Sequence, residues 1–287
     1  MCLIALALNP NSQWRMVLAA NRDEYLDRPT APLSWWPDGV TAGGRDLRVG
    51  GSWMALSKSG RFAAVTNVRL GNAPVNPDWQ SRGNLIGHAM ASEVSSADLL
   101  DRLGGVGPCN LLWGDLSKSS DALFFASNQA KNQAKNQTKP AAIEALDSSQ
   151  CYGLSNAQLN ANWPKTIGLK KDLLSAIAAH SLDSKGLINH LFSALSDATQ
   201  APDDDLPETG VSLAMERTLS ARFIATDTYG TRSSTVMLID HQSKALIIER
   251  SWDHAANKIS EHSVDQHRLS QLTPYTERSI QFRINPD

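Results

Sequence analysis

Short runs of apolar residues, separated by turn-forming residues, dominate the first part of the chain. The runs at 2–8 and 16–20 flank an Asn-Pro-Asn-Ser segment at 9–12, which has the chemistry of a turn. A Lys-Ser-Gly turn joins the runs at 53–57 and 61–65 in the same way. The pattern predicts two β-hairpins, and the first of them buries the N-terminal segment.

The segment between the two hairpins, 28–51, is rich in Pro, Trp and Gly and has no clear apolar run. A connection of this length is unusual in a compact domain unless it has a function. We therefore expect a long loop that either is functional or wraps around the core.

Helical spacing appears in the middle of the chain. Apolar residues recur every three to four positions at 84–93, 97–103, 164–179 and 182–198. In the two longest windows the apolar faces consist of Leu169, Leu173, Leu174 and Ile177, and of Leu187, Ile188, Leu191 and Leu195. These windows predict helices that pack on a sheet.

Strand-like runs surround the helical windows. They lie at 110–113, 122–126, 152–155, 221–228, 234–240 and 245–249, with a turn at 241–244 and an acidic surface loop at 202–208. Helices grouped between strands favour an α+β fold of antiparallel sheets and argue against a doubly wound parallel sheet.

No strong boundary divides the chain, so we expect one domain over 1–252. The tract at 128–140 repeats Asn-Gln-Ala-Lys units and is too polar to support a core, which predicts an exposed excursion. The tail at 253–287 is polar and poorly patterned. We expect it to pack on the domain or to extend from it.

Composition narrows the class of protein. The 287 residues are 41% hydrophobic and 20% charged, with a net charge of -2, which is typical of a globular protein without a global attraction to nucleic acid. No run approaches the roughly 18 apolar residues of a membrane span, and the first run lacks the basic segment of a secretory signal. We expect a cytoplasmic protein without nucleic-acid partners or integral membrane contact. No feature specifies an oligomeric state.

Cysteine and histidine usage excludes several kinds of site. The three cysteines, Cys2, Cys109 and Cys151, are too few for a disulfide framework, and they form no CxxC pair for zinc. P-loop, HExxH and GxSxG motifs are absent. His262 and His267 lie in the polar tail without further ligands, so we expect no metal site.

Cys2 follows the initiator methionine, which is generally removed before a small residue. Removal would leave a thiol next to its own α-amine, whose unperturbed pKa is about 7.7–8.0. One residue would then supply both a nucleophile and the base that activates it. The alternative is a small buried side chain on the first strand.

Four polar residues, 21–24, end the second apolar run and would lie beside Cys2 in the predicted hairpin. An arginine near a thiol lowers its pKa, and Arg22 is placed to do so. Asp23 can hold a terminal ammonium group. The alternative is a solvated turn at the end of a strand.

Several ordered motifs together resemble the NRDE family, also called the transport and Golgi organization protein 2 family. They are Met1-Cys2, Ala20 to Glu24, Arg28-Pro29-Thr30, Ala42 to Asp46, Gly50 to Trp53, Ala64 to Arg69, Ser81-Arg82-Gly83 and Tyr229 to Ser234. The match is dense over 1–83 and sparser over 150–240. Ser52 stands where the family usually has threonine.

The resemblance implies a four-layer αββα sandwich of the N-terminal nucleophile hydrolase type, similar to choloylglycine hydrolases and penicillin V acylases. It implies catalytic roles for Cys2, Arg22, Asp23, Asn67, Asn156 and Arg232. Cys2 would be the nucleophile, and the two asparagines would bind the oxyanion. Arg232 would correspond to an arginine that lies late in the sequence of those acylases. Arg22 and Asp23 are adjacent here, whereas the acylases space them apart.

Further residues of the same motifs are candidates for binding a ligand. They are Asn21, Glu24, Arg45, Asp46, Trp53 and Arg69. Several of the eight tryptophans, including Trp35 and Trp36, lie in this part of the chain. They predict either core packing or an amphipathic wall for a flat or long apolar ligand.

Three hypotheses about function follow. In the first, the protein cleaves an amide or thioester of a small acyl compound through Cys2 and needs no cofactor. In the second, it is a non-catalytic binding or trafficking protein for haem, acyl-CoA or lipid, as the resemblance implies for eukaryotic relatives. No Cys-Pro haem motif is present. In the third, it is a scaffold without chemistry.

Overall fold

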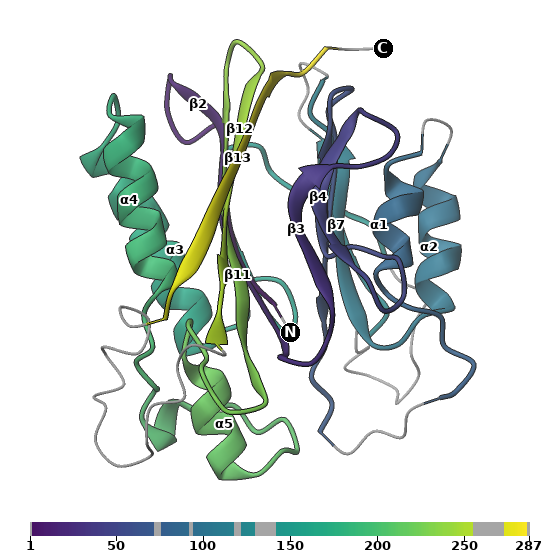
Figure 1. Ribbon diagram of the computed structural model, residues 1–287, viewed down its shortest axis with the longest axis vertical. Coiled ribbons are helices and arrows are strands. Elements are labelled where there is room, and N and C mark those ends of the chain that lie inside the picture. Colours follow the sequence, from purple (N-terminus) through teal and green to yellow (C-terminus); the bar gives the residue numbers. More distant parts are fainter. Residues whose placement is uncertain are drawn as a thin grey trace.

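Two antiparallel sheets packed face to face, with helices on both outer faces, form the molecule (Figure 1). The computed structural model describes residues 2–71, 76–91, 94–117, 122–129, 142–254 and 273–285. The layers confirm the α+β class and the four-layer αββα sandwich. Among the described residues, no helix is both long enough and apolar enough to cross a membrane.

The first sheet contains six strands. Their order is β10 (Cys151–Leu154), β1 (Cys2–Leu8), β2 (Trp14–Tyr25), β11 (Tyr229–Asp240), β12 (Lys244–Trp252) and β13 (Tyr275–Arg283). Helices α3 (Pro164–Ala179) and α4 (Ser184–Leu195) cover its outer face (Figure 1).

The second sheet contains seven strands. Their order is β3 (Thr30–Trp35), β4 (Thr41–Asp46), β5 (Met54–Ser57), β6 (Arg61–Asn67), β7 (Cys109–Asp115), β8 (Ala122–Ser127) and β9 (Glu144–Ala145). Helices α1 (Asn84–Ala89) and α2 (Ser96–Gly104) cover its outer face (Figure 1). A short 3-10 helix, η1 (Asp203–Asp205), and helix α5 (Leu213–Ser220) follow α4 in the chain.

Strand β1 shows why the N-terminal run is apolar at every position. Successive side chains of a strand point to opposite faces. Ile4 and Leu6 therefore pack between the two sheets, whereas Leu3 and Ala5 pack against the α3–α4 layer. A strand buried on both faces has no alternation of polar and apolar residues. The burial of β1 fixes the end of the strand at which Cys2 lies.

The expectation of a long loop at 28–51 was wrong, because β3 and β4 lie within it. The sequence pattern does not reveal β4, because Gly43 and Gly44 stand in the middle of the strand. A Cβ atom at Gly44 would collide with the Trp53 ring, and one at Gly43 would collide with the main chain of β5. These glycines let neighbouring groups approach closely, but they leave the strand without the apolar side chains by which it could be predicted.

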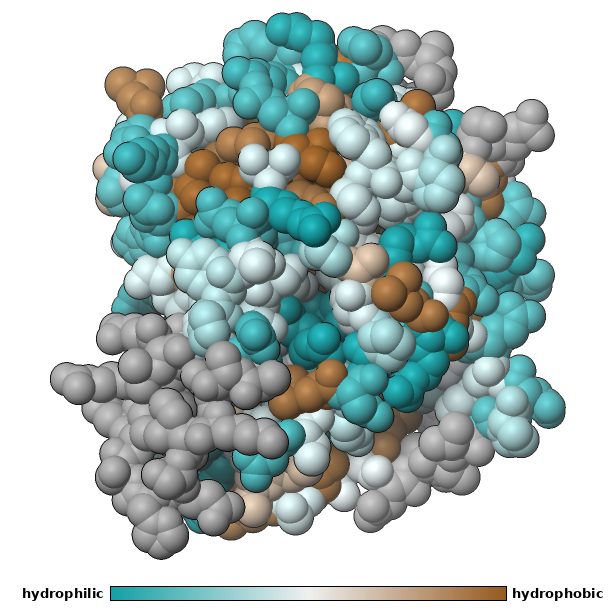
Figure 2. Space-filling model, in the orientation of Figure 1, coloured by the Kyte–Doolittle hydropathy of each residue, from teal (hydrophilic) through white to brown (hydrophobic). Residues whose placement is uncertain are grey.

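The C-terminal tail also contains a strand that the sequence did not predict. β13 pairs with β12 along its whole length, from Lys244 opposite Arg283 to Trp252 opposite Tyr275. It is an edge strand and most of its side chains are exposed. On this face of the molecule, Figure 2 shows mostly hydrophilic residues around a hydrophobic patch in the upper half. Main-chain hydrogen bonds to β12 position β13, and Ile280 and Phe282 near its end pack against the core. The residues before them are exposed, so the apolar signal of this edge strand is short.

Other boundaries differ in detail. The run at 221–228 forms no strand, and α5 precedes it instead. Leu174 was placed on the apolar face of α3, but its side chain is 47% exposed. The acidic loop at 202–208 includes η1. Positions 130–141, most of the Asn-Gln-Ala-Lys tract, and 255–272, with His262 and His267, lie outside the described residues.

Candidate functional site

The first hairpin places Cys2 beside Arg22. β1 and β2 pair in antiparallel register with Cys2 opposite Arg22, and the connecting turn includes Asn9 in the left-handed region at φ 43°. Asparagine is among the residues that tolerate this conformation. The hairpin predicted from the apolar runs therefore brings together the thiol and the guanidinium group predicted to support it.

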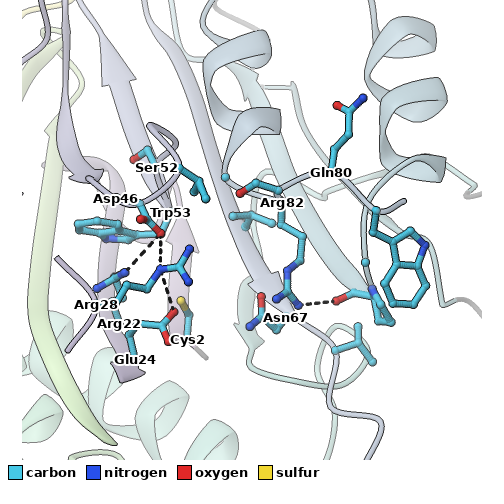
Figure 3. Close-up of a pocket in the computed structure, with 18 of the residues that line it drawn as sticks. Cys2, Arg22, Glu24, Arg28, Asp46, Ser52, Trp53, Asn67, Gln80 and Arg82 are labelled. Atoms are coloured by element: carbon cyan, nitrogen blue, oxygen red, sulfur yellow. Dashed lines mark hydrogen bonds and ion pairs between the residues drawn. The ribbon is translucent and has the colours of Figure 1, made fainter. Parts of the chain in front are cut away.

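Cys2 borders a cavity of about 560 Å³ between the two sheets. This volume falls within the range of small-molecule pockets. Figure 3 shows Cys2, Arg22, Glu24, Arg28 and Asp46 on one side of the cavity. The opposite side includes Asn67, Gln80 and Arg82 (Figure 3). Apolar lining is supplied by Val49, Trp53, Val65, Val68, Leu70, Pro77, Trp79 and Pro108.

Ion pairs hold the cationic side chains on the Cys2 side. Arg28 Nε lies 2.6 Å from Asp46 Oδ2, and Arg22 lies 4.0 Å from the same oxygen. Arg28 Nε is also 3.9 Å from Glu24 Oε2. The guanidinium of Arg22 lies over the Trp53 ring, 4.4 Å from its centroid. The structure thus brings together the predicted residues Arg22, Glu24, Asp46 and Trp53.

The environment of Cys2 keeps its thiol protonated. Burial is the main cause that raises the pKa of Cys2, and the negative charges of Asp23 and Glu24 act in the same direction. The positive charge of Arg22 lowers it without reversing the shift. Since the thiolate is the reactive form, this cysteine needs a base to become a nucleophile.

Asp23 is buried next to Cys2 and has a fixed orientation. Thr231 donates its hydroxyl to Asp23 Oδ1 at 2.7 Å. Burial raises the pKa of Asp23, while the nearby ammonium of Lys165 opposes the rise. Lys165 lies in the first turn of α3, and burial lowers its pKa to about 8. The sequence pattern does not single out Lys165, because a lysine at the start of a helix is ordinarily exposed.

The two predicted asparagines occupy different positions. Asn67 ends β6 and lines the cavity. Asn156 is buried and donates its Nδ2 to the main-chain carbonyl of Asn67 at 2.9 Å. Its neighbour Ser155 donates to the carbonyl of Cys2 at 3.1 Å. The segment with Ser155 and Asn156 therefore ties the strand ends of Cys2 and Asn67 together.

Arg232 lies outside the cavity lining. It is the unpaired residue of an irregularity in β11, because Thr231 pairs with Asp23 and Ser233 pairs with Arg22. Its guanidinium donates to the carbonyls of Tyr25, Leu26 and Arg28 at 2.9–3.0 Å. These contacts fix the chain that follows β2. Bulges of this kind are common next to active sites.

Asn21 faces the helical layer. Its Nδ2 donates to the carbonyls of Leu195 and Arg222, each at 2.8 Å, and its Oδ1 accepts from Ser234 at 2.6 Å. Adjacent strand residues point to opposite faces, so Asn21 and Arg22 cannot share one side of the sheet. Asn21 therefore supports the packing of the first sheet on its helices.

Arg45 and Arg69 also lie outside the cavity lining. Arg45 stacks over the Trp36 ring, 4.6 Å from its centroid, and donates to the carbonyl of Gly50. Arg69 pairs with the buried Glu216 at 2.6 Å and lies over the Trp163 ring. The structure therefore does not place these two arginines in the cavity that Cys2 borders.

The segment 76–83 forms a wall of the cavity that the sequence pattern does not predict. It contributes Asn76, Trp79, Gln80 and Arg82 to the lining. The Ser81-Arg82-Gly83 motif was the one available signal. No metal site accompanies this wall: among the described residues, no group of three or more His, Cys, Asp or Glu side chains is placed to hold an ion.

Solved structures of similar fold include hydrolases. A Caenorhabditis elegans N-acylethanolamine-hydrolyzing acid amidase ortholog is 12% identical, with a TM-score of 0.45, covering 83% of this chain and 92% of that one. A variant of the conjugated bile acid hydrolase from Clostridium perfringens is 10% identical, with a TM-score of 0.45, covering 100% and 98%. At these identities the likeness concerns the fold alone.

Comparison of sequences identifies the family. The mouse Transport and Golgi organization 2 homolog is 28% identical over 268 residues, which cover 88% of this chain and 93% of the relative. The human homolog is 29% identical over 270 residues, with the same coverage. The family model described as Transport and Golgi organisation 2 matches residues 1–254. The chain therefore belongs to the Transport and Golgi organisation 2 family.

Proposed function

We propose that the protein is a cysteine hydrolase that cleaves an amide or thioester of a small acyl compound through Cys2. The observation that carries the proposal is the position of this thiol. It borders a cavity of about 560 Å³ beside Arg22, with the Asn67 side of the second sheet opposite. A nucleophile, a cation and an amide thus converge on one space large enough for an acyl group.

Activation of Cys2 requires removal of Met1. The freed α-amine, whose unperturbed pKa is about 7.7–8.0, accepts the thiol proton. Asp23 is fixed by Thr231 at 2.7 Å and lies on the adjacent strand, where its carboxyl group can hold the resulting ammonium. The positive charge of Arg22 favours the thiolate.

Hydrolysis then proceeds by two acyl transfers. The Cys2 sulfur forms a bond to the substrate carbonyl carbon, and the bond to the leaving nitrogen or sulfur breaks. The leaving group takes the proton from the α-amine. The amine next takes a proton from water, whose oxygen attacks the thioester of Cys2. The free acid departs and the thiol is restored.

Our candidate for donating a hydrogen bond to the oxyanion is Asn67, which lines the cavity opposite Cys2. The loss of one such donor typically lowers kcat by about 10²–10³. We therefore expect Asn67→Ala to reduce kcat by this factor with little change in KM, because the bond strengthens mainly in the transition state. Steady-state kinetics on one acyl substrate measure the effect.

Asn156→Ala tests the contact that supports the main chain of Asn67. The Asn156 amide holds the main chain of Asn67 at 2.9 Å and is buried. Its loss should lower the free energy of unfolding by roughly 1–3 kcal/mol, as measured by urea denaturation. An Asn67→Ala variant with an unchanged kcat would refute the role of Asn67 in binding the oxyanion.

A second candidate function is binding without catalysis, with haem, acyl-CoA or another lipid as the ligand. The observation that favours it is the buried Cys2 thiol, whose pKa is raised in the chain that retains Met1. The apolar side chains of Leu70 and Trp79 along the cavity suit an acyl chain or a flat ring.

The two functions are separated by an assay of a full chain that begins at Cys2. Hexanoyl amides and hexanoyl thioesters serve as substrates, and release of hexanoic acid is measured against a reaction without protein. Catalysed release above the spontaneous rate supports the hydrolase. Tight binding of the same compounds, with release no faster than the spontaneous rate, supports the binding protein and refutes the hydrolase.

A further inference from the structure

The cavity contains an arginine that forms no ion pair with any carboxylate in the described part of the chain. Arg82 lines the side opposite Arg22 and Arg28 (Figure 3). Within the described part of the chain, its guanidinium group makes one polar contact, a hydrogen bond from Nη1 to the carbonyl of Pro108 at 3.3 Å. A guanidinium group has five N–H donors. Most of its donors are therefore available to a ligand.

The other cavity arginines have protein partners. Arg28 is paired with Asp46 at 2.6 Å, and Arg22 lies 4.0 Å from the same carboxylate. Arg82 is half-buried, and burial lowers its pKa, while the charge of Glu24 opposes this shift without forming an ion pair. Removing a cation from water without a counter-charge costs free energy. A ligand anion would offset that cost.

The main chain around Arg82 is held in place. Ser52 donates its main-chain N–H to the carbonyl of Gly83 at 3.2 Å, and Gln80 donates to the carbonyl of Gly105 at 3.1 Å. A Cβ atom at Gly51 would collide with the main chain of Gly83, so this approach is close. Arg82 is thus presented by a fixed segment, as a preorganised binding group requires.

We propose that Arg82 binds an anionic group of the ligand, a carboxylate or a phosphate, while the acyl carbonyl lies at Cys2. The planar fork of arginine matches both anions with two parallel hydrogen bonds. The amide side chains of Gln80 and Asn76 line the same wall. The inference rests on the proposed function for the position of the acyl group, and it narrows the substrate class to anionic acyl compounds.

The anion can belong to the acyl group or to the leaving group, and three thioesters distinguish these sources. Hexanoyl-N-acetylcysteamine carries no charge. Adipoyl-N-acetylcysteamine has the same chain length with a carboxylate at its end. Hexanoyl-3-mercaptopropionate has a carboxylate on the leaving group. Binding of each compound to the Cys2→Ala variant is measured by calorimetry, so the result does not depend on turnover.

We expect one of the two carboxylate compounds to bind roughly 10- to 100-fold more tightly than the neutral one, the range of a charge-assisted hydrogen bond. The preference should vanish in Cys2→Ala/Arg82→Gln and fall to an intermediate value in Cys2→Ala/Arg82→Lys. The matched control is Arg102→Gln in the same background. Arg102 is an exposed arginine of α2 outside the cavity lining. This control should keep the preference.

Equal binding of the three compounds, no binding of any, or a preference that survives Arg82→Gln would overturn the inference. Circular dichroism and urea denaturation establish that each variant is folded, and Arg82→Lys retains the charge if Arg82→Gln does not fold. An Arg82-dependent preference for a carboxylate compound, without hydrolysis by the chain that begins at Cys2, would refute the proposed hydrolase and leave the anion site standing. Hydrolysis without the preference would refute the anion site and leave the proposed hydrolase standing.

Discussion

Replacement of Cys2 by alanine is expected to abolish hydrolysis of amides and thioesters, with a loss in kcat of at least about 10³-fold. The reason is that no other thiol of the described chain borders the cavity. Substrate binding should persist, because the change removes only the sulfur atom. Steady-state kinetics and calorimetry measure the two quantities separately.

Cys151→Ala is the matched control for Cys2→Ala. Cys151 lies in β10 opposite Ala7 of β1, and burial raises its pKa to about 11. It is therefore protonated at neutral pH and lies away from the cavity. We expect this variant to keep its kcat within about threefold. Full turnover by Cys2→Ala would contradict the assignment of the nucleophile.

A chain that retains Met1 is expected to lose about 10²–10⁴ in kcat, which is the usual contribution of a general base. In such a chain the nitrogen of Cys2 is part of a peptide bond and cannot accept a proton. Burial keeps the pKa of the Cys2 thiol raised, so little thiolate forms at neutral pH. Intact-mass measurement establishes which N-terminus each preparation carries.

The pH dependence separates the two chains further. For the chain that begins at Cys2, kcat/KM should rise with pH as the α-amine loses its proton, near its unperturbed pKa of about 7.7–8.0, and then level off. The chain that retains Met1 should lack this limb and gain reactivity only where the raised pKa of the thiol is reached. Equal turnover by both chains would exclude the α-amine as the base.

The sequence predicted the parts of the fold in which side-chain pattern and burial agree. The α3 window at 164–179 matches the helix, since Leu169, Leu173 and Ile177 are buried on one face. The first hairpin was predicted from two apolar runs and a turn. That hairpin was enough to place Cys2 near Arg22.

The unpredicted strands leave only a weak apolar pattern in the sequence. β4 has glycines where neighbouring groups must approach. β13 is an edge strand that is exposed over most of its length, and only its end at Ile280 and Phe282 packs against the core. Likewise, the cavity roles of Arg82 and the buried Lys165 depend on which segments the fold brings together. Strand alternation alone would have placed Asn21 on the face opposite Arg22.

The central claim, that Cys2 carries the acyl group, is tested most directly by the intact mass of the chain quenched during turnover of a hexanoyl thioester. We predict a species heavier by one hexanoyl group, located by peptide mapping on the N-terminal Cys2, that disappears when the substrate is exhausted. A chain that turns over substrate without acylation of Cys2, or that carries the acyl group at Cys109 or Cys151 instead, would contradict the claim.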